Sequence, residues 1–131
     1  MPAGESYPED LLYHREHDWA RIDGDEALLG ITWFAADSLG ELVHYEPPAE
    51  GTEIRKDQSY GEVESVKAVS DVIAPLSGEV VEVNARVLEA PETVNDDPYG
   101  EGWLVRIRLS DPSERDALLD VEAYRRVLAE Q

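Results

Sequence analysis

The chain has 131 residues, a formal net charge of −19 and no cysteine. Its length fits a single domain, and the absence of cysteine excludes a disulfide framework and a cysteine metal site. The charge disfavours binding to nucleic-acid phosphates and to anionic membranes. Hydrophobic residues make up 42% of the chain, enough for a folded core. We therefore expect one acidic, monomeric domain over 1–131 that meets partners with basic surfaces.

The N-terminal segment indicates where the protein resides. Residues 1–5 (MPAGE) are acidic and lack the basic and apolar pattern of a signal peptide. No apolar run approaches the roughly 20 residues that span a bilayer. We expect a cytoplasmic, prokaryotic protein. A mature mitochondrial protein whose presequence has been removed is the alternative.

The first half of the chain predicts an irregular arm followed by a hairpin. Residues 1–16 mix proline, charged and aromatic residues, which favours an irregular N-terminal arm. Residues 17–22 and 27–31 alternate as strands on either side of a turn at 23–25 (DGD). Thr32 is a suitable N-cap for a short helix over 33–39, and Gly40 can end it.

The rest of the chain predicts more strands and a helical end. Short β patterns occur within a β core of about 17–109, at 42–45, 61–73, 78–83 and 103–109. Many short strands separated by turns are typical of a sandwich or barrel. Asp111 can cap a helix whose first residue is Pro112. Apolar residues at helical spacing follow, so one or two helices are expected over 111–129.

An internal repeat suggests how the β core is organised. Residues 40–43 (GELV) recur as 78–81 (GEVV), and residues 60–62 (YGE) recur as 99–101. Two copies predict two β units related by a quasi-two-fold axis, because an open solenoid needs three or more repeats. Chance similarity is the alternative, since Gly-Glu pairs are common in an acidic chain.

Lysine is scarce, so few residues are candidates for chemistry that needs a primary side-chain amine. The chain has only two lysines, Lys56 and Lys67. A single lysine in a β segment usually serves solubility or protects a sheet edge. However, Gly51 precedes Lys67 by sixteen residues and Gly78 follows it by eleven. This spacing resembles the lipoyl and biotinyl carrier domains, whose modified lysine stands at a hairpin tip between glycines that serve neighbouring turns.

The residues around Lys67 narrow the resemblance to one family. Biotin acceptors generally have Met-Lys-Met, whereas Val66 and Ala68 flank Lys67 here and favour lipoate. The chain resembles the glycine cleavage system H proteins from about Tyr13 to Tyr124. The motifs that carry this resemblance are 30–32 (GIT), 61–68 (GEVESVKA), 70–71 (SD), 74–75 (AP), 77–80 (SGEV) and 97–103 (DPYGEGW).

The resemblance implies a mainly β fold of the α+β type, a lipoyl-type barrel-sandwich hybrid. It implies a carrier without catalytic residues or metal, with lipoate covalently attached to Lys67. Such a carrier takes the aminomethyl group of glycine from glycine decarboxylase (P protein) to the aminomethyltransferase (T protein). Dihydrolipoyl dehydrogenase (L protein) then reoxidises the arm, and a lipoyl-attaching enzyme is the fourth partner.

The resemblance also implies supporting acids. Asp71 and Asp18 match positions that shelter the loaded, cationic arm in this family, although Asp18 stands where the family usually has Glu. Glu64 is positioned to guide the lipoyl-attaching enzyme. Solvated strand-face charges are the alternative for all three, because the chain has thirty acidic residues.

Other features leave alternatives open. Residues 33–36 (WFAA) depart from the Asp-aromatic-Ala-Gln run usual in the family. This favours keeping a second hypothesis, a diverged H-like protein that serves lipoate relay or another redox partner. His14, His17 and Asp18 have a spacing that could ligate a metal. A stand-alone hydrolase or metal protein with the same fold is the third hypothesis, and no catalytic constellation supports it.

Overall fold

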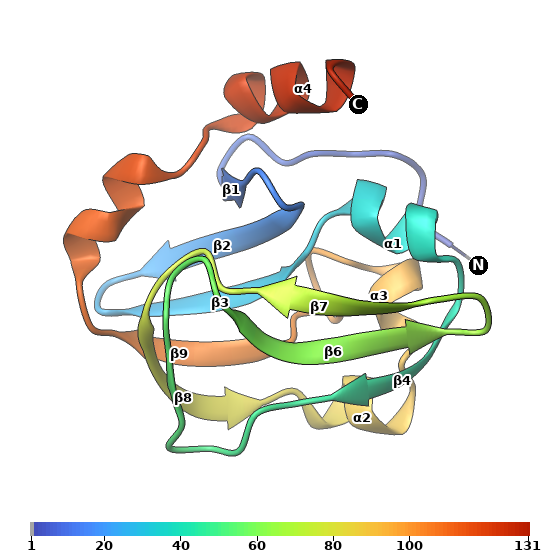
Figure 1. Ribbon diagram of the computed structural model, residues 1–131, viewed down its shortest axis with the longest axis horizontal. Coiled ribbons are helices and arrows are strands. Elements are labelled where there is room, and N and C mark those ends of the chain that lie inside the picture. The colour runs from blue at the N-terminus through green and yellow to red at the C-terminus, as the bar shows by residue number, and fades with distance from the viewer. Residues whose placement is uncertain (1) are drawn as a thin grey trace.

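The computed structural model describes residues 2–131 and contains two antiparallel sheets (Figure 1). The larger sheet has the strand order β1-β2-β3-β9-β8-β5, and the smaller has the order β4-β6-β7. The strands are β1 (Leu12–His14), β2 (Asp18–Asp23), β3 (Glu26–Ile31), β4 (Leu42–Glu46), β5 (Glu53–Ile54), β6 (Ser59–Ser65), β7 (Val69–Ile73), β8 (Gly78–Val83) and β9 (Val105–Leu109). The predicted mainly β fold is confirmed.

The core lies between the two sheets. Leu29 and Ile107 of the larger sheet and Leu42, Val63 and Val72 of the smaller are each at most 1% exposed and belong to one cluster. Along β3, the alternate residues Ala27, Leu29 and Ile31 belong to this cluster, as the period of a half-buried strand requires. Each such side chain contributes about 1.5–3 kcal/mol when it leaves water. The smaller sheet is therefore held against the larger one by its inner face.

The chain also forms short helices in residues 2–131: α1 (Trp33–Leu39), α2 (Ala85–Glu89), α3 (Thr93–Asp96), the 3-10 helix η1 (Pro112–Ala117) and α4 (Val121–Ala129). α1 begins and ends as predicted, since the Thr32 hydroxyl accepts from the Ala35 amide and the Gly40 amide donates to Ala36. The predicted C-terminal helices are η1 and α4. None of the helices in residues 2–131 is long and apolar enough to cross a membrane.

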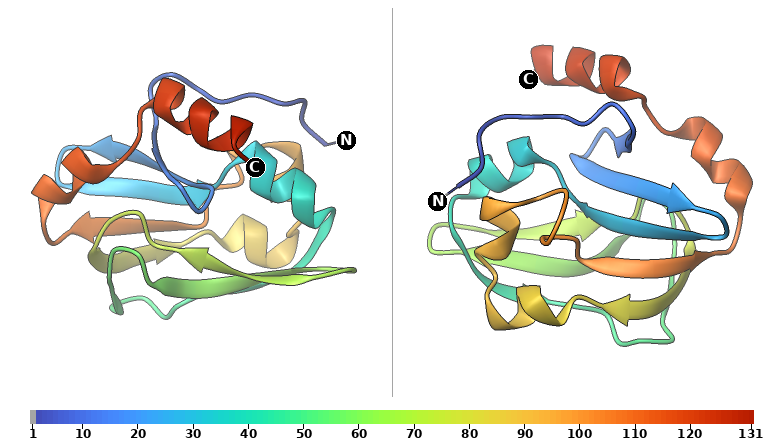
Figure 2. Two further views of the ribbon diagram at one scale, coloured as in Figure 1. Left: turned by 45° about the horizontal axis from the view of Figure 1, so that its top comes forward. Right: turned by 180° about the vertical axis from the view of Figure 1, so that it is seen from behind.

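The N-terminal arm is more ordered than the sequence predicts. Residues 12–14 form β1, which pairs with β2, and Tyr13 also bridges to Leu119. Tyr13 stacks on Tyr124 of α4 with ring centroids 4.7 Å apart. Figure 2 shows α4 lying over the N-terminal segment. The expectation of an irregular arm over 1–16 was wrong at β1, because a three-residue strand is too short to show periodicity and depends on distant partners.

The repeated residues fall partly on similar structures. Residues 40–43 lead into β4 and residues 78–81 begin β8, so the first repeated pair enters a strand twice. Residues 60–62 lie in β6, whereas residues 99–101 form a turn before β9. Gly100 and Gly102 pack so closely against Asp97 that a Cβ at either glycine would lie less than 3 Å from it. Turn packing therefore explains Gly100 of the second copy and Gly102, which follows it.

Candidate functional site

Lys67 lies in the turn of the β6–β7 hairpin, and Figure 1 shows this turn at one end of the molecule. The strands pair from Ser59 and Ile73 up to Glu64 and Val69, and residues 66–68 make the connection. Ser65 is 3% exposed and closes this turn. Its amide donates to the Ala68 carbonyl at 2.8 Å, and its hydroxyl oxygen accepts from the amides of Lys67 and Ala68 at 3.3 and 3.2 Å. A buried hydroxyl thus takes the place of the Asn-Gly signal of many hairpins.

The Lys67 side chain is exposed. Within residues 2–131, its ammonium has no hydrogen-bond or ion-pair partner. Its Cε and Nζ lie 3.5 and 4.0 Å from the position that a Cβ would occupy on Gly40. Gly40 has φ 85° and ψ −167°, a backbone conformation that is essentially restricted to glycine. The end of α1 therefore supports the Lys67 side chain without binding its charge.

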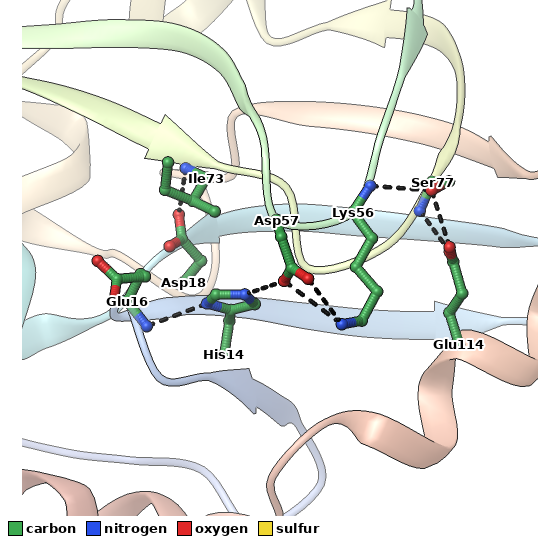
Figure 3. Close-up of polar contacts among 8 residues, drawn as sticks. All are labelled: His14, Glu16, Asp18, Lys56, Asp57, Ile73, Ser77 and Glu114. Carbon is green, nitrogen blue, oxygen red and sulfur yellow. Dashed lines mark hydrogen bonds and ion pairs between the residues drawn. The ribbon is translucent and has the colours of Figure 1, made fainter.

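Lys56, the other lysine, is held in a polar network (Figure 3). Its ammonium donates to both carboxylate oxygens of Asp57, at 3.3 and 3.1 Å. The His14 ring nitrogen Nε2 lies 2.7 Å from the same carboxylate. The hydrogen bond from His14 and the contact with Lys56 lower the pKa of Asp57 below its ordinary value. Of the two primary side-chain amines, that of Lys67 alone has no partner within the part of the chain that the structure describes.

A second contact closes the same end of the molecule. The Lys56 backbone amide donates to the Ser77 hydroxyl oxygen at 2.9 Å. The Ser77 amide and hydroxyl donate to the two carboxylate oxygens of Glu114, at 2.7 and 2.9 Å. The turn before β6, the turn before β8 and η1 are therefore joined at the base of the lysine hairpin.

Asp18 fixes that base from inside. It is 1% exposed, and its Oδ2 accepts from the Ile73 amide at 3.2 Å (Figure 3). Within residues 2–131, its Oδ1 has no hydrogen-bond partner. Burial raises the pKa of this carboxyl well above its ordinary value. Since Ile73 follows Lys67 by six residues, about 20 Å of extended strand separates Asp18 from the tip, and Asp18 joins β2 to β7.

The other predicted acids lie on the outer face of the hairpin. Glu62 and Asp71 are paired across β6 and β7, and both are exposed. Glu64 is also exposed and lies nearer the tip, opposite Val69. The Asp71 carboxylate accepts from the Ser59 hydroxyl at 3.2 Å. Asp71 is four residues from Lys67, about 13 Å along the strand. The structure therefore brings Glu64 and Asp71 onto one face and leaves Asp18 away from it.

The two glycines that flank the hairpin in sequence have different reasons to be glycine. Gly51 has φ 90° in a turn, and its amide donates to the Val80 carbonyl at 2.7 Å. Gly78 is the first residue of β8, where a Cβ would lie 2.3 Å from the Arg108 carbonyl oxygen. Gly51 serves a turn as expected, whereas Gly78 permits the close approach of β8 to β9.

His14 and His17 contact different residues. His14 contacts Asp57, as described above, whereas the His17 ring nitrogen Nδ1 lies 2.8 Å from the Tyr124 hydroxyl. Burial lowers the pKa of His17 below its ordinary value. Residues 2–131 contain no group of three or more His, Cys, Asp or Glu residues that could hold a metal ion. The spacing of His14, His17 and Asp18 therefore reflects contacts with three different partners.

Known proteins resemble this chain in sequence and in fold. The family described as Glycine cleavage H-protein matches residues 11–131. A glycine cleavage system H protein from Symbiobacterium thermophilum is 51% identical over 117 residues, covering 89% of this chain and 91% of that protein. One from Rubrobacter xylanophilus is 52% identical over 124 residues, covering 95% and 96%.

A solved structure supports the same relation. The crystal structure of a glycine cleavage system H protein from Mycobacterium marinum superposes with a TM-score of 0.86 at 39% identity. The match covers 94% of this chain and 99% of that chain. Sequence and fold therefore agree over nearly the whole molecule.

Proposed function

The chain belongs to the glycine cleavage H-protein family, and we propose that it carries the aminomethyl group of glycine on a lipoyl arm attached to Lys67. The free amine at the tip of the hairpin is the observation that carries this proposal. Lys67 is exposed and unpaired within residues 2–131, whereas the ammonium of Lys56 is bound to Asp57. An acylating enzyme can therefore reach Lys67 without breaking an ion pair.

The residues present fit the lipoyl group. Amide formation at Nζ removes the ammonium charge, and no neighbouring carboxylate loses a partner when this happens. From bond lengths of about 1.5 Å, the lysine and lipoyl chains together form an arm of about 14 Å. The bound group supplies two sulfur atoms that carry a one-carbon unit and exchange electrons. Because the chain has no cysteine, no protein thiol competes with them by disulfide exchange.

The protein supplies a rigid base for this arm. β7 is held along β6 by the ladder, and at its end by the bond from the Ile73 amide to Asp18. The turn at the tip is closed by Ser65. A fixed attachment point with a flexible arm gives the reactive end a high effective concentration at each partner's active site. The chain thus acts as a non-catalytic carrier.

Charge indicates how partners meet the hairpin. Glu62, Glu64 and Asp71 lie on the outer face of the small sheet, in a chain of net charge −19. Such a face steers basic docking surfaces toward the arm. The proposed partners are the P, T and L proteins of glycine cleavage and the lipoyl-attaching enzyme. Glu64, three residues before Lys67, is the acid that the attaching enzyme meets first.

Intact mass spectrometry after incubation with a lipoyl ligase, lipoate and ATP tests the attachment site. We expect one lipoyl group on the wild-type chain and none on the Lys67→Arg variant. The Lys56→Arg variant is the matched control and keeps full modification. A lipoyl group on Lys56 would contradict the assignment.

Reconstitution separates the glycine cleavage role from lipoate relay. The lipoylated chain is mixed with the P, T and L proteins, glycine, tetrahydrofolate and NAD⁺, and NADH formation is followed. We expect glycine-dependent turnover that requires the lipoylated chain. Complete lipoylation without glycine turnover would favour the relay hypothesis instead.

A further inference from the structure

A pocket of about 380 Å³ lies on the outer face of the larger sheet. The register aligns Arg21 of β2 with Leu28 of β3, and Leu28 with Arg106 of β9. All three residues line the pocket, together with Trp103, which precedes β9 by two residues. Because Leu29 belongs to the core between the sheets, Leu28 faces the opposite side. The right-hand view of Figure 2 shows β2, β3 and β9 in front of the smaller sheet, so the pocket opens away from the β6–β7 hairpin.

The two arginines of this pocket differ in how their charge is balanced. The Arg106 guanidinium donates to Glu26 at 2.9 Å and to Glu82 at 3.0 Å. Arg21 is half-buried and has no carboxylate partner within residues 2–131, although the chain has thirty acidic residues. Of its five N–H donors, the Tyr99 carbonyl accepts from one, at 3.0 Å. Arg21 therefore brings an uncompensated positive charge and further hydrogen-bond donors to the pocket.

The Arg21 guanidinium is held in place by an aromatic ring. Its Cζ lies 5.4 Å from the centroid of the Trp19 ring, close enough for a cation–π attraction. Trp19 is itself fixed, because it is fully buried and its indole N–H donates to the Pro98 carbonyl at 3.1 Å. Its ring lies over Gly30, where a Cβ would be 2.6 Å away. A charged group that is positioned in advance loses less conformational entropy when a ligand binds.

We propose that this pocket binds a small aromatic carboxylate, with the carboxylate on Arg21 and the ring against Leu28 and Trp103. A guanidinium can bind a carboxylate through two parallel N–H···O bonds. Small-molecule sites combine apolar walls with a few fixed polar groups and have volumes from about 300 Å³ upward, and this pocket meets both conditions. Lys67 does not line it, so the inference is independent of the proposed attachment of the lipoyl arm.

The acids on the rim of the pocket make the charge of the ligand testable. Asp23 and Glu26 line the pocket and are paired across β2 and β3. Glu26 is bound to Arg106, whereas Asp23 is exposed and forms no ion pair with Arg21. Asp23 therefore repels an anion on Arg21 and would attract a cation. Removing its charge should strengthen the binding of a carboxylate and weaken the binding of an ammonium ligand.

Titration of the full chain with 1-naphthoate tests the proposal, and 1-naphthamide is the uncharged control of the same shape. The ¹H–¹⁵N NMR spectra report the Trp103 indole N–H, the Arg21 Nε–H and the Leu28 amide. We expect saturable shifts of all three resonances with 1-naphthoate. The amide should bind about fivefold more weakly, because it cannot form the ion pair with Arg21.

Three variants separate charge recognition from apolar contact. Arg21→Gln should weaken 1-naphthoate binding about fivefold. Arg55→Gln is the matched control, because it removes the charge of an exposed arginine outside the pocket and should retain the affinity. Asp23→Asn should tighten binding about twofold, since an exposed like charge repels the ligand only weakly. Asp23 is exposed, so this variant is expected to fold, which the same spectra check.

Four results would overturn the inference. The absence of saturable shifts would show that the pocket takes no such ligand. Equal affinity for 1-naphthoate and 1-naphthamide would show apolar contact without charge recognition. Shifts confined to the Trp33 indole N–H would place the ligand elsewhere, because Trp33 does not line this pocket. Weaker binding of 1-naphthoate to Asp23→Asn would show that the ligand does not bind as an anion on Arg21.

Discussion

The two lysines lie at opposite ends of β6 and have opposite surroundings. Lys56 precedes the strand, and its ammonium is bound by Asp57, which also pairs with His14. Lys67 follows the strand at an exposed tip next to Val66, which is 86% exposed. The same side chain is thus part of a polar network at one end, and at the other it is an exposed ammonium without a partner among residues 2–131. Context, more than residue type, distinguishes the surroundings of the two amines.

The base of the hairpin should be intolerant of added volume. A Cβ at Gly78 would lie 2.3 Å from the Arg108 carbonyl oxygen, so Gly78→Ala must separate β8 from β9. We expect a loss of about 3 kcal/mol in the free energy of unfolding, as for other cases of overpacking. Gly24→Ala is the control, because nothing lies near its Cβ position and only its φ of 65° opposes alanine. Urea unfolding compares the two, and equal losses would contradict close packing at the base.

Asp18 should make the free energy of unfolding depend on pH. Because burial raises the pKa of this carboxyl in the folded chain, its contribution to stability is complete below the ordinary value of 3.8 and is lost as pH rises through the folded pKa. Asp18→Asn should remove this loss and gain about 1–3 kcal/mol at pH 8, the cost of a buried polar group that lacks a partner. Urea unfolding from pH 4 to 8 measures it, with Glu50→Gln as control. Parallel pH profiles for wild type and Asp18→Asn would show that the buried charge costs nothing.

The local stability of the turn at the hairpin tip should depend on the Ser65 hydroxyl. Ser65→Ala removes the acceptor for the amides of Lys67 and Ala68. We expect a loss of about 1 kcal/mol in the local opening free energy, and hence roughly fivefold faster hydrogen exchange at those two amides. Ser70→Ala, on the same hairpin, is the control and should leave these rates unchanged. Unchanged exchange in Ser65→Ala would mean that the strand ladder alone holds the tip.

Asp57 should account for the difference in reactivity between Lys56 and Lys67. Asp57 has φ 71°, a conformation that asparagine also tolerates, so Asp57→Asn keeps the turn and removes the carboxylate. An exposed ion pair is worth at most about 1 kcal/mol, so acylation of Lys56 by limiting acetic anhydride should rise two- to fivefold. Acylation of Lys67 is the internal control and should not change. Peptide mass spectrometry measures both sites, and an unchanged Lys56 would show that another group protects it.

The same substitution tests stability in acid. Because the pKa of Asp57 is lowered in the folded chain, its contribution is complete above the ordinary value of 3.8 and is lost as pH falls through the folded pKa. Unfolding of the wild type and of Asp57→Asn should therefore differ at pH 7 and converge near pH 2. A constant difference over this range would contradict the role of the charge.

Local signals predicted several elements well. The Thr32 cap and Gly40 stop bounded α1, and the turn at 23–25 separated β2 from β3, as the structure confirms. Each of these signals acts within four residues, through a side chain and the adjacent backbone. α2 and α3 were missed, although Asn84 caps α2. Helices of five and four residues are too short for a hydrophobic period.

The candidate site could be predicted only in part. The motif around Lys67 indicated the hairpin, but it did not reveal that Ser65 closes the turn or that Gly40 supports the lysine. Ser65 carried a usable signal, because a serine two residues before a tip can accept backbone amides. Asp18 carried none. Its burial and its bond to Ile73 depend on a strand 55 residues away.

The sequence by itself determined the period of the strands, the ends of α1, the scarcity of lysine and the motif that surrounds Lys67. These features depend on composition and on residues close together in the chain, so they do not require the tertiary structure. Only the tertiary structure decided that Asp57 also pairs with His14, and that Arg21 and Trp103 line the same pocket. Those facts need residues far apart in sequence to meet. Close packing and the burial of polar groups fix such meetings, and both depend on the complete fold.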